Sequence, residues 1–132
     1  MNEQKSEVAI VPIKDGTSQR SIPTVWRPAL RRVVDAIVLG DYALLNNVDE
    51  VEVISKATVL QIQSYIRNYG ATLKFLPEDS WNTSVYIWAG NYWDVLVDLY
   101  TNEEGLSDLV MSARVTEGDN GYRFSIQMVY VP

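Results

Sequence analysis

Hydrophobic and polar residues alternate along residues 85–130, and this alternation is the strongest structural signal in the chain. At its centre, one side of the expected strand is uniformly apolar, with Trp93, Val95, Val97 and Leu99. The other side carries Tyr92, Asp94, Leu96, Asp98 and Tyr100. This pattern predicts a half-buried antiparallel strand whose second face meets either water or a partner that favours negative charge and aromatic rings.

Four strands are predicted in this half of the chain, at residues 85–89, 92–100, 108–115 and 122–131. The first two flank Gly90-Asn91, a pair that favours a tight hairpin, and the last two are joined by a turn that ends in Asn-Gly. The residues expected to face the core from the last two strands are Leu109, Met111, Ala113, Val115, Phe124, Ile126 and Met128.

Two amphipathic helices precede the strands. Apolar residues recur with helical spacing from Leu30 to Val38, after Pro28 and before a stop at Gly40. A shorter helical turn at residues 42–45 is capped by Asp41. Ser55 predicts the N-cap of the second long helix and Gly70 its end. Its inner face is expected to carry Val59, Ile62, Ile66 and Tyr69.

The predicted fold class is α+β, with two main helices packed on one face of a curved four-stranded antiparallel meander. We expect a single domain over residues 1–132. Its N-terminal segment, 1–25, is extended, with a short edge strand at 8–13 and a loop at 14–20; residues 28–70 form the helical part and residues 71–132 the sheet. Residues 48–54 suit a short edge strand or an extended loop.

Composition narrows the possible chemistry. The 132 residues include no cysteine and no histidine, and the net charge is −6. Disulfides, thiolate chemistry and the usual neutral acid–base residue are therefore excluded, and a reducing cytoplasm is the expected location. An acidic body repels phosphate backbones and anionic membranes and attracts basic partners, so we expect no nucleic acid and no membrane as partner. No run of 18 apolar residues occurs, and no secretory segment is predicted.

Carboxylates and aromatic residues are the candidates for a site. Asp94 and Asp98 are expected about 13 Å apart along one strand face, which is too far for a catalytic pair. Glu103, Glu104 and Asp108 lie around a glycine, where they could hold a divalent cation, although a role of Asp108 in closing the turn is favoured. Trp88, Tyr92 and Tyr100 could pack in the sheet or anchor a partner. We expect no cofactor and no metal.

The run from Trp93 to Leu109 resembles the signature W-x-V-x-V-D-L-(aromatic)-T-x-E-E-G-x-S-D-L of a family of small uncharacterised bacterial proteins. Some members of that family resemble immunity proteins encoded beside polymorphic or contact-dependent toxins. A second, looser likeness is to the cystatin-like or NTF2-like cone, because Gly40-Asp41-Tyr42 after the first helix is similar to the start of that fold. Enzymes of that fold usually place Asp, His or Tyr in the cone.

These features predict a non-enzymatic acidic interaction protein, and the first resemblance implies an immunity protein that neutralises a basic toxin domain by stoichiometric binding. The alternative is an NTF2-like or cystatin-like domain that binds a small ligand or acts as an enzyme. A third possibility is a regulatory subunit that dimerises through its sheet, and the oligomeric state is left open. The residues expected to contact the partner are Asp94, Asp98, Glu103, Glu104, Asp108, Trp88, Tyr92 and Tyr100.

Overall fold

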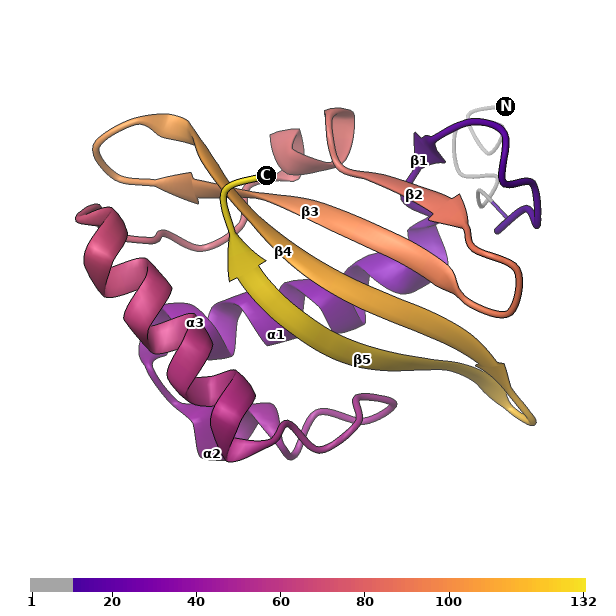
Figure 1. The fold of residues 1–132 in the computed structure, drawn as a ribbon, viewed down its shortest axis with the longest axis horizontal. Helices are drawn as coiled ribbons and strands as arrows, with labels where there is room; N and C mark the ends of the chain where they lie inside the picture. The colour runs from indigo at the N-terminus through magenta and orange to yellow at the C-terminus, as the bar shows by residue number, and fades with distance from the viewer. Residues whose placement is uncertain (1–10) are drawn as a thin grey trace, which may run out of the picture.

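The fold is α+β, with a single antiparallel sheet that carries helices on one side (Figure 1). The computed structural model describes residues 11–132. The helical elements are η2 (Thr24–Trp26), α1 (Arg27–Leu39), α2 (Tyr42–Leu45), α3 (Lys56–Tyr69) and η3 (Glu78–Asn82). The strands are β1 (Arg20–Ser21), β2 (Val85–Trp88), β3 (Trp93–Thr101), β4 (Gly105–Gly118) and β5 (Gly121–Tyr130).

In the described part of the chain, the sheet has five strands in the order β1-β2-β3-β4-β5, so the predicted number of four is wrong. The additional strand, β1, is two residues long and pairs Arg20 with Tyr86. It lies where the sequence predicted a loop and an extended segment, because two residues are too few to show an alternating pattern. The predicted strand at 8–13 falls partly outside the described residues, and its described part, 11–13, is not in a strand.

The inner face of β3 is as predicted, since Trp93, Val95, Val97 and Leu99 are at most 1% exposed. They face α1, which crosses behind the sheet (Figure 1). This helix contributes the fully buried Leu30 and Val33 to the same core. An aromatic cluster centred on Trp26 occupies one end of this core, with neighbouring rings at 5.3–6.5 Å from its centroid. Those rings belong to Tyr86, Trp93, Tyr122 and Phe124.

The register of the sheet shifts at two places, once in the pairing of β3 with β4, between Asp98 and Tyr100, and once in the pairing of β4 with β5. The pairing of β4 with β5 shifts between Ser112 and Ala113, so Ser112 faces Met128 while Ala113 faces Ile126. Because one extra residue in a strand turns all later side chains to the opposite face, Val129 is buried and Met128 is 39% exposed. The prediction that Met128 faces the core is therefore wrong. The other predicted core residues of β4 and β5 are buried.

The local signals for the helices are confirmed in atomic detail. The Asp41 carboxylate accepts a hydrogen bond from the Leu44 N–H at 2.9 Å, and Ser55 Oγ accepts one from the Thr58 N–H at 3.1 Å. Gly40 and Gly70 end their helices with φ of +68° and +86°, the left-handed conformation that glycine adopts at low cost. No helix among residues 11–132 is both long and apolar enough to cross a membrane.

Two connections differ from expectation. The connection between the strands predicted at 92–100 and 108–115 is shorter than expected and forms a tight turn, because β3 extends to Thr101 and β4 begins at Gly105. Residues 48–50 form turns, with a φ of +72° at Glu50, and Val51 then makes an isolated bridge with Phe124 at the edge of β5. Of the predicted inner residues of α3, Ile62 is fully buried and the others are partly buried.

Candidate partner-binding face

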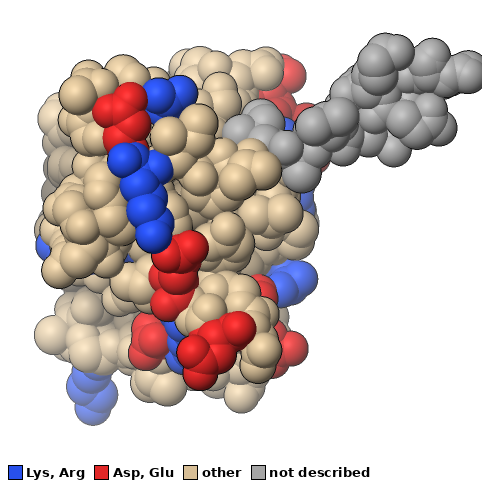
Figure 2. Space-filling model, turned by 90° about the vertical axis from the view of Figure 1, so that its right-hand side faces the viewer, with Lys and Arg blue, Asp and Glu red and all other residues tan. Residues whose placement is uncertain are grey.

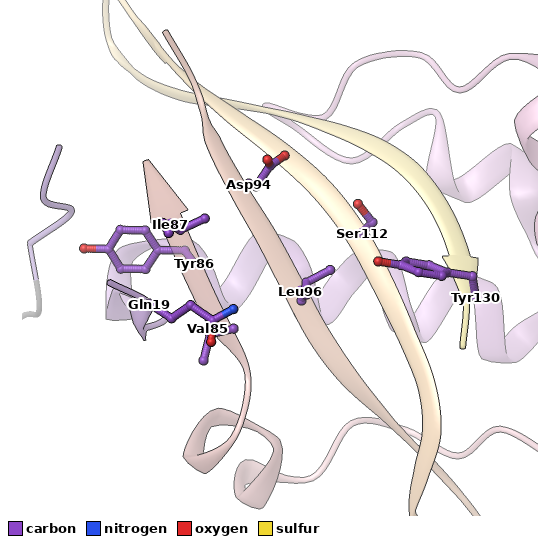
Figure 3. Close-up of a pocket in the computed structure, with 8 residues that line it drawn as sticks. All are labelled: Gln19, Val85, Tyr86, Ile87, Asp94, Leu96, Ser112 and Tyr130. Atoms are coloured by element: carbon purple, nitrogen blue, oxygen red, sulfur yellow. The ribbon is translucent and has the colours of Figure 1, made fainter. Parts of the chain in front are cut away.

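Within residues 11–132, no helix covers the sheet face opposite α1, and we call it the open face (Figure 1). Residues from four strands form it. On β3 these are the even-numbered positions, whose side chains point away from the core. A shallow hollow of about 270 Å³ lies on this face, lined among others by Ile87, Asp94, Leu96, Ser112 and Tyr130. Figure 3 shows the Tyr130 ring reaching from β5 across β4 towards Ser112.

Tyr92 and Asp94 lie at one end of the open face, as the alternation predicts. The Arg114 guanidinium carbon is 4.5 Å from the centroid of the Tyr92 ring, and its Nε is 3.9 Å from Asp94 Oδ1. Both members of this ion pair are about half exposed, so solvent screens their attraction and a partner cation can compete for the carboxylate.

Asp98 and Tyr100 lie towards the other end of the same strand face. Burial raises the pKa of the Tyr100 phenol, and the negative charges of Asp79 and Asp98 raise it further. The phenol therefore stays protonated at neutral pH and can donate a hydrogen bond. Asp79, on η3, was not among the predicted site residues, because only tertiary packing brings it next to β3.

Glu103 and Glu104 lie away from the open face, in the β3–β4 turn, where both bind other parts of the chain. Glu103 accepts a hydrogen bond from the Thr72 N–H at 2.8 Å, and this bond lowers the pKa of Glu103. Glu104 accepts one from Tyr69 Oη at 2.9 Å and one from the buried Thr101 hydroxyl at 3.0 Å. These bonds hold the end of α3 against the sheet, and they occupy carboxylates that the sequence suggested for a partner.

The turn-closing role suggested for Asp108 belongs to its neighbour Ser107. Ser107 Oγ donates to the Leu99 carbonyl at 2.8 Å and accepts from the Leu109 N–H at 3.1 Å. These groups lie where the pairing of β3 with β4 skips residues. Asp108 is exposed, and its N–H donates to Tyr69 Oη at 3.3 Å.

Trp88 lies on the inner side of the sheet, at its end, with its ring 4.9 Å from that of Trp93. Its surroundings include Lys14, whose Nζ is 5.3 Å from the Trp88 ring centroid. The eight predicted residues therefore divide into three places. Tyr92, Asp94, Asp98 and Tyr100 share the open face; Glu103, Glu104 and Asp108 lie near the β3–β4 turn; and Trp88 lies at the opposite end of the sheet.

The described residues contain no group of three or more acidic side chains placed to hold a metal ion. A second hollow, of about 470 Å³, adjoins the Tyr92 end of the open face and is lined by Arg114, Arg123, Glu52 and neighbours. Arg123 is paired with Glu52 at 3.0 Å. The open face thus offers shallow, mixed apolar and charged surface, the kind of surface that other proteins can contact over a broad area.

The fold and this face define an α+β domain with one covered and one open side of an antiparallel sheet. Residues 34–132 match the model of a family described as Domain of unknown function (DUF7668), and the chain belongs to this family. This match agrees with the expectation of an uncharacterised family. No curated protein and no solved structure matches the chain.

Proposed function

We propose that the chain is a non-enzymatic interaction protein that binds a basic protein domain through its open face and acts by stoichiometric binding. By its resemblance to immunity proteins, its partner is a toxin domain whose active site or access to nucleic acid it blocks. The observation that carries the proposal is the uncovered sheet face, on which Asp94 and Asp98 flank the apolar Leu96.

The chemistry of the open face suits a basic partner. Its centre is apolar, and its carboxylates remain partly exposed while the protein as a whole carries a net charge of −6. Such an arrangement accelerates the encounter with a cationic surface and orients it. Tyr92 and Tyr100, both partly buried, supply the rigid aromatic contact area that is common at the energetic centre of interfaces.

The alternative of an NTF2-like or cystatin-like ligand-binding domain needs a pocket between the helices and the sheet. That space is occupied by packed side chains, among them Trp26 and Trp93 with ring centroids 5.3 Å apart. The filled core therefore favours the interaction protein over the ligand-binding cone.

Charge reversal on the open face tests the proposal. The test first examines the open reading frames beside this gene for a basic toxin domain, and finding none would count against the proposal. A domain found there is produced in a catalytically inactive form, and its association is followed by stopped-flow fluorescence at several salt concentrations. The variant Asp94→Lys/Asp98→Lys is expected to associate at least about tenfold more slowly, with a weaker salt dependence.

The matched control is Asp35→Lys/Asp49→Lys, which changes the net charge equally at α1 and at the segment beside β5. Equal slowing in both variants would mean that net charge alone matters, and an unchanged rate in the first variant would remove the open face from the interface. If the wild-type chain does not bind the neighbouring domain, the proposed function is wrong.

A further inference from the structure

Residues 11–17, which we call the strap, lie across the end of the sheet and are held there through their backbone. The Ile13 N–H donates to Tyr86 Oη at 2.8 Å, and Trp93 Nε1 donates to the Ile13 carbonyl at 3.1 Å. Two aromatic side chains from neighbouring strands thus satisfy both backbone groups of one extended residue. Such paired contacts are how a groove binds an extended peptide independently of its side chains.

The next residue, Lys14, inserts its ammonium group among three side chains of the sheet. Its Nζ is 5.3 Å from the Trp88 ring centroid and 5.9 Å from that of Trp93, both within cation–π range. Glu117, on β4, accepts a hydrogen bond from Nζ at 2.7 Å. Two tryptophans and a carboxylate are a combination that recognises a lysine ammonium.

Burial of apolar side chains contributes little to holding the strap. Val11 is 67% exposed and Ile13 is 45% exposed, and the Lys14 and Glu117 side chains are 50% and 56% exposed. Figure 2 shows basic and acidic side chains side by side at this end of the molecule, open to the viewer. The aromatic residues beneath are fixed in the core, since Tyr86 and Trp93 are 1% exposed. The site is therefore rigid, whereas its occupant is held by two backbone hydrogen bonds at Ile13 and two partly exposed ion pairs, Lys14–Glu117 and Asp15–Arg20.

From this geometry we infer that Tyr86, Trp88, Trp93 and Glu117 form a binding site for an extended lysine-bearing segment of a protein partner. Ile13 and Lys14 occupy the site in the free chain and compete with that segment. The inference rests on the proposed function, because it names the feature by which a basic partner is recognised. It adds a second contact region, at the end of the sheet, to the open face.

The position of Gly16 provides a way to release the strap without changing the site. A Cβ at residue 16 would lie 2.9 Å from the Trp88 carbonyl oxygen, closer than real Cβ contacts occur. Gly16→Val should therefore displace the strap, and Lys14→Ala removes its ammonium directly. Lys74→Ala, an exposed lysine near the other end of β3, is the matched control.

The test titrates a synthetic peptide that copies residues 11–16, with blocked ends, into the full-length chain and follows the Trp93 indole N–H by NMR. Gly16→Val and Lys14→Ala are each expected to bind the peptide at least about tenfold more tightly than the wild type and Lys74→Ala do, because a self-occupied site lowers apparent affinity. A peptide with alanine in place of its lysine should not bind. Trp88→Ala and Glu117→Gln, each added to Lys14→Ala, should weaken binding at least about tenfold.

Equal affinity for the wild type and both strap variants would overturn the inference, as would binding that ignores the peptide lysine. If Gly16→Val fails to fold, Lys14→Ala alone decides. Concentration-dependent dimerisation of the wild type, lost in Lys14→Ala, would make a second copy the occupant and also overturn it. The peptide titration does not involve the neighbouring toxin domain, so failure here is distinguishable from failure of the proposed function.

Discussion

Replacing Ser107 by alanine tests whether its hydroxyl stabilises the place where the pairing of β3 with β4 skips residues. The Ser107 hydroxyl binds the Leu99 carbonyl and the Leu109 N–H, and both of these residues are at most 1% exposed. Without the hydroxyl, two backbone groups in a region that water scarcely reaches lose these partners. Each buried group left unsatisfied costs about 1–3 kcal/mol, so the two together predict that Ser107→Ala lowers the free energy of unfolding by about 2–6 kcal/mol.

This loss is large enough to measure by two methods. For a chain of 132 residues, an unfolding entropy of about 0.28 kcal/mol/K converts the loss into a fall in Tm of about 7–21 °C. Urea denaturation followed by tryptophan fluorescence should give the same loss at an unchanged m-value. Asp108→Ala, next to it and exposed, is the matched control and should stay within about 0.5 kcal/mol. A similar small effect for Ser107→Ala, or a larger effect for Asp108→Ala, would refute the assignment.

Three further predictions concern the fold. Val97→Asp should prevent folding because Val97 is fully buried, whereas Asp98→Asn on the open face should leave the denaturation midpoint nearly unchanged; equal midpoints for Val97→Asp and wild type would contradict the register. Gly70→Ala should cost about 1–2 kcal/mol in urea denaturation, because an alanine is strained at φ +86° although its Cβ meets no atom within 4 Å; a stabilised variant would contradict this. The pKa of Glu103 is lowered in the folded chain, so its contribution to stability is present above its unfolded pKa and is lost as the pH falls through the acidic range. Glu103→Gln should therefore reduce the loss of Tm on acidification, and identical pH profiles would argue against the bond to Thr72.

Local signals in the sequence were sufficient for the helices and for most of the sheet. Helical periodicity with Asp41 and Ser55 as caps, and glycines at 40 and 70 as stops, depends only on residues within one or two turns, and each signal is found in the structure. Alternation likewise placed the β3 side chains on their correct faces.

What the sequence did not reveal depends on how distant segments meet. A bulge is a property of two paired strands, so alternation within β5 alone continued through Gln127 and misplaced Met128. Glu103 and Glu104 look like free acidic side chains until α3 is brought against the turn. Lys14 and Glu117 are 103 positions apart, and nothing local to either residue signals their contact.

Other segments of the chain form hydrogen bonds with the outer edges of β3 and β5, which is why we expect a partner to be recognised through side chains. Beyond the end of β2, Ser80 and Ser84 bind the backbone of Asp98, at 2.7 and 2.8 Å, and the segment at 72–74 binds β3 further along. These contacts occupy the β3 edge.

At the opposite side of the sheet, backbone groups of Glu50 and Glu52 bind both backbone groups of Phe124 on β5. The Gln61 side chain does the same for Val129. An edge whose hydrogen-bonding groups are occupied in this way cannot take up another strand without first losing these contacts, which is how proteins prevent strand addition. Along β3 and β5 a partner therefore meets side chains, on the open face and around Trp88, and this makes Asp94, Asp98 and Glu117 more informative positions for mutation than the backbone edges of these two strands.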